Sequence, residues 1–173
     1  EEAFPGMVLD AKAGVRFILK HAKEYNIDTN KLFLMGDSSG AYTALMAGIT
    51  WEIPELEEHN TQGENPIKGI IDFYGPTNIS TMNEELSTQD HRTADSPEGC
   101  MIGGVPVLEH PELYKPTIIA DYIDENREIP EILMFHGSND ELVPFGQSCS
   151  LYEVLKAKNK KATFYQMLNL HHG

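Results

Sequence analysis

A serine between two glycines, placed where a strand-like run gives way to a helix-like run, constrains this chain more than any other feature. Residues Gly36–Gly40 read Gly-Asp-Ser-Ser-Gly, after the apolar run Leu32–Met35 and before the run Ala41–Ile49. In so tight a turn we expect Ser38 to be strained and both glycines to be required, because larger side chains would clash. The turn would present the Ser38 hydroxyl at the carboxyl end of a strand. The pattern predicts a nucleophilic serine, with an ordinary helix N-cap as the alternative.

The remaining periodicity predicts an α/β fold with a mainly parallel sheet flanked by helices. Strand-like and helix-like runs alternate along the chain, and such alternation is typical of a parallel sheet covered on both faces. Residues 77–127 have no long period, and we expect them to form an insert of short helices and loops that caps the site. Residues 1–173 should form a single domain. Besides the runs around the serine, we expect helices at Met7–Tyr25 and Pro144–Asn159, and strands at Ile67–Tyr74, Glu131–Gly137 and Ala162–Leu168.

Charge and composition exclude several classes of partner. The chain has 27 acidic and 13 basic residues, a net charge of -14, which disfavours nucleic acid and anionic membrane surfaces. There is no apolar run long enough to cross a bilayer and no signal-peptide pattern at the first residues. We expect Cys100 and Cys149 to be unpaired, and neither to be catalytic, because neither lies at a glycine-flanked turn. The compartment is left open.

A base and an acid for the serine follow later strands. A serine hydroxyl needs a base to take its proton, and the base needs a carboxylate to orient it. Asp140 follows the strand Glu131–Gly137, and His172 follows the last strand. The chain order Ser38, Asp140, His172 is that of the α/β-hydrolases. The sequence therefore predicts that these three side chains meet at one edge of the sheet.

Each of these assignments has an alternative. Asp140 could be a solvated turn aspartate, and Asp72, near the end of another strand, is a rival acid. His171 competes with His172 as the base. His136 lies at a strand end before the acid, and we expect it to pack under the site.

Several segments resemble the esterases of the α/β-hydrolase superfamily. They are Gly36–Ala41, His136–Pro144, Gln147–Ser148 and the closing His172–Gly173. The resemblance is to the carboxylesterase group that includes feruloyl- and acetylxylan-esterase-like enzymes, whose insert the segments Ser96–Glu98 and Ile102–Gly104 also resemble.

The resemblance implies a serine carboxylester hydrolase that forms an acyl-enzyme, with short-chain or carbohydrate-linked esters as substrates. It also implies that the base is the histidine before glycine, His172, and that the Ser39 backbone N–H is one oxyanion donor. No cofactor is required. No zinc site is expected, because His171 and His172 have no acidic partners at ligand spacing, and no phosphate loop or dinucleotide fingerprint is present.

The chain departs from this family in two ways. It has no His-Gly-Gly segment before the serine to supply a second oxyanion donor, and it has neither the family's earlier strands nor its final helix. We therefore expect a C-terminal portion of the fold, with its last four strands, from a longer enzyme. The strand Leu32–Met35 would then be an open edge through which oligomers could form. A serine peptidase or amidase of the same fold and a non-catalytic binding module are the alternative functions.

Overall fold

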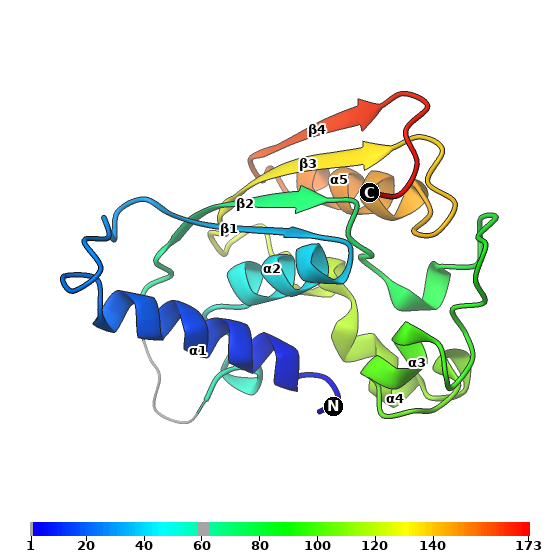
Figure 1. Cartoon of the computed structure of the whole chain (residues 1–173), viewed down its shortest axis with the longest axis horizontal. Coiled ribbons are helices and arrows are strands. Elements are labelled where there is room, and N and C mark those ends of the chain that lie inside the picture. Colours follow the sequence, from blue (N-terminus) through cyan, green and yellow to red (C-terminus); the bar gives the residue numbers. More distant parts are fainter. Residues whose placement is uncertain (1, 59–62) are drawn as a thin grey trace.

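The described part of the molecule is built on a four-stranded parallel sheet. The computed structural model describes residues 2–58 and 63–173. The strands are neighbours in space in the same order as in the chain, β1-β2-β3-β4 (Figure 1). All three pairings are parallel, so the carboxyl ends of the strands lie at one edge of the sheet. The strands are β1 (Leu32–Asp37), β2 (Ile67–Phe73), β3 (Glu131–Gly137) and β4 (Ala162–Met167), close to the predicted runs.

Three longer helices cover one face of this sheet. They are α1 (Gly6–Lys20), α2 (Ser39–Ile49) and α5 (Gly146–Ala157) (Figure 1). Sheet residues pack against helix residues in a single core that includes Ile70, Ile132, Met134, Leu45 and Leu151. Helix α1 is shorter than predicted, because turns replace the helix after Lys20. They lead to Asn26, whose left-handed backbone (φ 56°) reverses the chain.

The prediction that helices cover both faces of the sheet is wrong for the described residues. On the other face the exposed fractions of Phe33, Met35 and Tyr165 are 59%, 69% and 52%. Phe73, Phe135 and Tyr165 stack there in a row, with ring centroids 5.1 and 5.3 Å apart. The cause is topological. Crossovers between parallel strands are right-handed, and each strand here lies beside the one before it, always toward the same edge of the sheet. The connecting helices α2 and α5 therefore lie on the same face.

Residues 77–127, called the insert below, connect β2 to β3 without adding a strand. They form short helical turns, among them α3 (Pro97–Met101) and α4 (Pro111–Tyr114), as the sequence predicted. The two thiols, Cys100 on the surface and the half-buried Cys149, are free. Within the part of the chain that the structure describes, every helix is too short or too polar to span a membrane.

Candidate active site

Ser38 lies in the sharp turn between β1 and α2. Its backbone has φ 51° and ψ −124°, a region that residues with a Cβ rarely occupy. A Cβ at Gly36 would lie 2.3 Å from the backbone carbon and oxygen of Gly40, so glycine is required at position 36. The same requirement was expected at Gly40 and is wrong. A Cβ at Gly40 would lie 3.8 Å from Asp37 Oδ1, which is an ordinary contact. It is the backbone of Gly40, and not the position of its missing side chain, that lies against Gly36.

Three side chains from separate strand ends form one chain of hydrogen bonds. The distance from His172 Nε2 to Ser38 Oγ is 3.1 Å, and the distance from His172 Nδ1 to Asp140 Oδ2 is 2.8 Å. A neutral imidazole with its proton on Nδ1 donates to Asp140 and leaves Nε2 free to accept the serine proton. The structure thus brings the predicted residues Ser38, Asp140 and His172 together in the arrangement that nucleophilic activation needs.

The Asp140 carboxylate is buried and accepts several hydrogen bonds. Its Oδ1 accepts from the amides of Leu142 (3.0 Å) and Val143 (2.9 Å). Its Oδ2, which faces His172, also lies 3.2 Å from His136 Nε2. Burial by itself would raise the pKa of Asp140, but the hydrogen bonds outweigh it and hold that pKa below its ordinary value. Asp140 is therefore an anion at neutral pH and can stabilise a protonated His172.

His136 does more than pack under the site. It is fully buried, its Nδ1 lies 2.7 Å from Ser148 Oγ, and its Nε2 lies 3.0 Å from the Val143 carbonyl. With the contact to Asp140, this extends the hydrogen-bonded chain from Ser38 down to α5. The sequence offered one signal for this role, since His136 is the last but one residue of β3 and precedes the acid by four residues.

The insert contacts residues 138–145, the loop between β3 and α5 that carries Asp140 and is called the acid loop below. The amide of Thr88 donates to the Glu141 carbonyl (2.7 Å), and Ser87 Oγ donates to the Leu142 carbonyl (3.0 Å). The Leu142 carbonyl also lies 3.0 Å from Nε2 of the buried His91. Sequence reasoning missed these contacts, because the irregular insert has no pattern that relates it to the loop after β3.

The loop that carries His172 packs directly on the end of β3. The amides of Ser138 and Asn139 donate to the carbonyls of Met167 (2.9 Å) and Leu170 (3.0 Å). A Cβ at Gly137 would lie 2.3 Å from the Leu170 carbonyl oxygen, so only glycine allows this approach. The close packing brings the histidine loop within reach of Asp140.

The alternative acid and base lie elsewhere. Asp72 is fully buried, its Oδ1 accepts from the Gly75 amide (2.9 Å), and burial raises its pKa to about 7. His171 points to the surface, where its Nδ1 lies 2.7 Å from Glu141 Oε2. Tyr74, which the sequence did not single out, follows β2 and packs edge-on against the His172 ring, with centroids 4.7 Å apart.

Ser39 is the first residue of α2. Its backbone amide therefore has no partner within the helix and is available to an oxyanion formed on the Ser38 side. Among the described residues, no group of three or more histidine, cysteine or acidic side chains is arranged to hold a metal ion.

The chain is similar to several known proteins. A curated relative, the esterase LipQ of Mycobacterium tuberculosis, is 23% identical over 98% of this chain and 39% of its own length. A solved structure of a truncated carbohydrate esterase from gut microbiota is 27% identical, covers 98% of this chain and 62% of its own, and superimposes with a TM-score of 0.84. A bifunctional GH43-CE protein from Bacteroides eggerthii is 30% identical over 99% of this chain and 25% of its own, with a TM-score of 0.77.

The chain spans less than half the length of the curated relatives that it matches. The names of these relatives agree with the expected class, since they are esterases and carboxylic ester hydrolases. The α/β-hydrolase fold predicted from the sequence is confirmed by the solved structures. A sequence profile of one family, BD-FAE, matches residues 1–155. By this match over most of its length, the chain belongs to the BD-FAE family.

Proposed function

We propose that this protein is a serine carboxylester hydrolase whose catalytic residues are Ser38, His172 and Asp140. The observation that carries the proposal is the hydrogen-bonded chain from Asp140 Oδ2 through His172 to Ser38 Oγ, with distances of 2.8 and 3.1 Å. The positive φ of Ser38 supports it, because backbone strain at a reactive residue persists only where the surrounding structure holds it.

In the first step Ser38 Oγ attacks the ester carbonyl carbon while His172 Nε2 takes the serine proton. The carbonyl electron pair moves onto oxygen, and the Ser39 amide donates to this oxyanion. When the oxyanion collapses, the bond to the leaving alcohol breaks, and His172 gives that alcohol its proton. The products are an acyl-enzyme on Ser38 and a free alcohol, with Asp140 stabilising the imidazolium between the two transfers.

In the second step a water molecule takes the place that Ser38 had in the first, as the attacking group. His172 takes a proton from water, the resulting hydroxide equivalent adds to the acyl carbon, and Ser38 leaves with its proton restored. A carboxylic acid is released, and no cofactor is consumed.

As substrates we propose short-chain esters or esters linked to carbohydrate. The support is the structural relative named as a carbohydrate esterase. We also propose that the insert serves as the cap of the site, in keeping with its hydrogen bonds to the acid loop.

The proposal is tested on the protein as its gene encodes it. A fluorophosphonate should label Ser38, identified by peptide mass spectrometry, and p-nitrophenyl acetate should be hydrolysed faster than a peptide p-nitroanilide. Faster cleavage of the anilide would instead favour a peptidase or amidase. Absence of label at Ser38 in a folded preparation would favour a binding module without catalysis.

A further inference from the structure

Tyr74, the residue after β2, has a backbone conformation that a tyrosine rarely adopts. Within residues 2–58 and 63–173, five residues other than glycine have a positive φ. Three of them are Asn26, Asn159 and Asn169, and asparagine tolerates this region because its short side chain can hydrogen-bond locally. The other two are Ser38, with φ 51°, and Tyr74, with φ 46°. A bulky residue at positive φ is an outlier, and such strain gathers at functional sites.

The backbone around Tyr74 is held by hydrogen bonds that do not involve its side chain. Its amide donates to the Phe135 carbonyl (2.8 Å), and the amide of Gly75 donates to Asp72 Oδ1 (2.9 Å). Glycine at position 74 could make the same backbone hydrogen bond without strain. The tyrosine side chain at this position therefore needs an explanation other than the shape of the turn.

The side chain of Tyr74 packs against both histidines that contact the acid. Its ring centroid lies 4.7 Å from that of His172 and 6.5 Å from that of His136, with interplanar angles of 61° and 66°. The hydrogen bonds of His172 occupy both of its nitrogens, Nδ1 with Asp140 and Nε2 with Ser38. The tyrosine ring therefore contacts another part of the imidazole, and it restrains rotation of the imidazole about the line through the two hydrogen bonds.

The loop that carries His172 gives this imidazole little support of its own. Every other residue from 168 to 173 is exposed, whereas the side chain of His172 has an exposed fraction of 18%. The orientation of His172 therefore depends on side chains from other elements. Asp140 and Ser38 supply the hydrogen bonds, and Tyr74 supplies a ring contact.

We propose that Tyr74 is a positioning residue for the base, whose ring holds the His172 imidazole in the orientation in which Nε2 reaches Ser38. The inference rests on the proposed function, because it concerns the base of that reaction. The orientation matters twice, since His172 must take the proton of Ser38 and then give it to the leaving alcohol. A displacement of about 1 Å can lower a rate about 100-fold, so the strain at Tyr74 is retained for turnover and not for stability.

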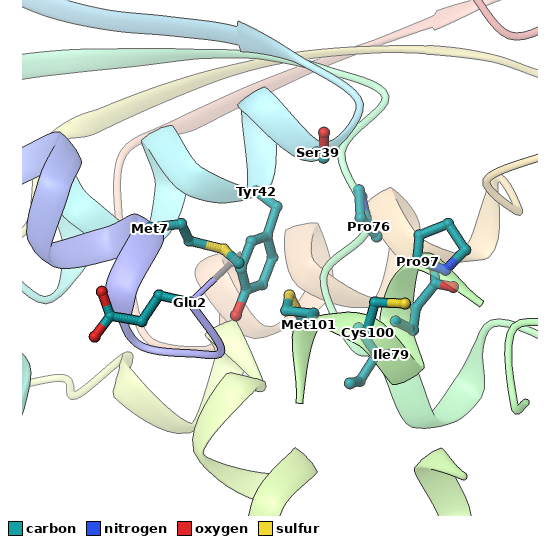
Figure 2. A pocket seen from close by; sticks show the side chains of 10 residues that line it. Glu2, Met7, Ser39, Tyr42, Pro76, Ile79, Pro97, Cys100 and Met101 are labelled. Atoms are coloured by element: carbon teal, nitrogen blue, oxygen red, sulfur yellow. The ribbon is translucent and has the colours of Figure 1, made fainter. Parts of the chain in front are cut away.

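Tyr74 is separate from the pocket beside the serine turn. This pocket, of about 230 Å³, lies between α2, the loop after β2 and α3 of the insert (Figure 2). Ser39, Tyr42 and Pro76 contribute to its wall, but Tyr74 is not one of the described residues that line it. A substrate group bound in this pocket would not contact Tyr74. Loss of the tyrosine ring should therefore change kcat and leave KM nearly unchanged.

The inference is tested by removing the ring while keeping the backbone conformation, in the protein as its gene encodes it. In Tyr74→Gly and Tyr74→Asn, kcat for p-nitrophenyl acetate should fall about 10- to 100-fold, with KM changed less than about threefold. The midpoint of thermal unfolding should stay within about 4 °C, because relief of strain offsets the lost ring contacts. Tyr74→Phe keeps the ring and should recover all but about threefold of the loss. Asn159→Gly, at an exposed position with φ 55° after α5, is the matched control and should change neither kcat nor KM.

Chemical modification of His172 gives a readout that does not depend on turnover. Diethyl pyrocarbonate should modify His172 faster in Tyr74→Gly than in the unsubstituted protein or in Tyr74→Phe, as read by peptide mass spectrometry. The rate at the exposed His171 should be the same in all three.

An unchanged rate of modification at His172, or an equal fall in kcat in Tyr74→Gly and Tyr74→Phe, would overturn the positioning role even if a fluorophosphonate labels Ser38. A large loss of stability in both Tyr74→Gly and Tyr74→Asn would also overturn it, because the ring would then serve the fold. Faster modification of His172 in Tyr74→Gly, in a protein whose Ser38 takes no label, would keep the positioning of His172 and overturn the proposed hydrolysis.

Discussion

The serine turn and the acid loop lie at the same edge of the sheet, but they are held in place in different ways. Ser38 is positioned by backbone geometry, with a positive φ and a glycine at position 36 where a Cβ would lie 2.3 Å from the next turn. Asp140 is positioned by several hydrogen bonds, from the nearby amides of Leu142 and Val143 and from His136, while Ser87 and Thr88 of the insert hold its loop from outside.

The position of Ser38 therefore depends on a few backbone atoms, whereas the position of Asp140 depends on many separate contacts. A strained turn tolerates no added atom at a few positions, but it depends little on side chains elsewhere. A carboxylate held by several donors should lose function in steps as donors are removed. Predictions ordered by the size of their effect test this contrast.

The largest effect is expected at the serine itself. Ser38→Ala should lower ester turnover by at least about 10⁴-fold, because the nucleophile is gone and only binding and oxyanion stabilisation remain. The matched variant Ser39→Ala keeps its backbone amide and should stay within about threefold of the original rate. Turnover of p-nitrophenyl acetate measures both, and a severe loss in Ser39→Ala alone would reverse the assignment of the two serines.

One methyl group added at position 36 should also disrupt the serine turn. Gly36→Ala should destabilise the fold by about 2–4 kcal/mol and abolish labelling of Ser38, because the new Cβ must displace backbone. Gly14→Ala, on an exposed face of α1 with no atom within 4 Å of the new Cβ, should be neutral or stabilising by up to about 1 kcal/mol. Thermal unfolding compares the two, and equal stabilities would contradict the backbone account.

Turnover should fall only in part when one hydrogen-bond donor to Asp140 is removed. His136→Phe should lower kcat about 10- to 100-fold with little change in KM, since Asp140 loses a partner while Ser38 and the pocket are unaltered. His136→Gln, whose amide can still donate, should recover part of the loss. If both variants match the original enzyme, His136 does not position Asp140.

The smallest effect on turnover is expected at Asp72, which is buried near the site but outside the hydrogen-bonded chain. Its pKa is raised to about 7 from an ordinary 3.8, so the folded protein binds a proton that the unfolded chain has released between these values. Stability should therefore fall as pH rises through this window, by at most about 1.4 kcal/mol per pH unit from this residue. Asp72→Asn should remove this slope in urea unfolding measured from pH 4.5 to 7.5. An unchanged slope would place its origin elsewhere.

The contrast also explains what the sequence could and could not predict. The strand, the glycine turn and α2 follow from local patterns, and the structure places them close to the predicted bounds. The meeting of Asp140 and His172 with Ser38 was predictable because parallel strands share one carboxyl edge. The catalytic roles of the three residues stay predictions.

Contacts made by segments without a period were not predictable. The hydrogen bonds from Ser87, Thr88 and His91 to the acid loop leave no repeating signal in the sequence. For His136, the position before the acid indicated only that it would pack under the site. The uncovered face was missed for another reason. Alternating strands and helices indicate crossovers, but only the spatial order of the strands determines the side on which the helices lie.

That uncovered face has a practical consequence for work on the polypeptide of residues 1–173. Produced by itself, it would carry the stacked rings of Phe73, Phe135 and Tyr165 into water together with the exposed side chains of Phe33 and Met35. A contiguous apolar surface of this kind promotes self-association, even in a chain with a net charge of -14. Solubility, dye binding and light scattering should therefore be measured before low turnover is attributed to the catalytic residues.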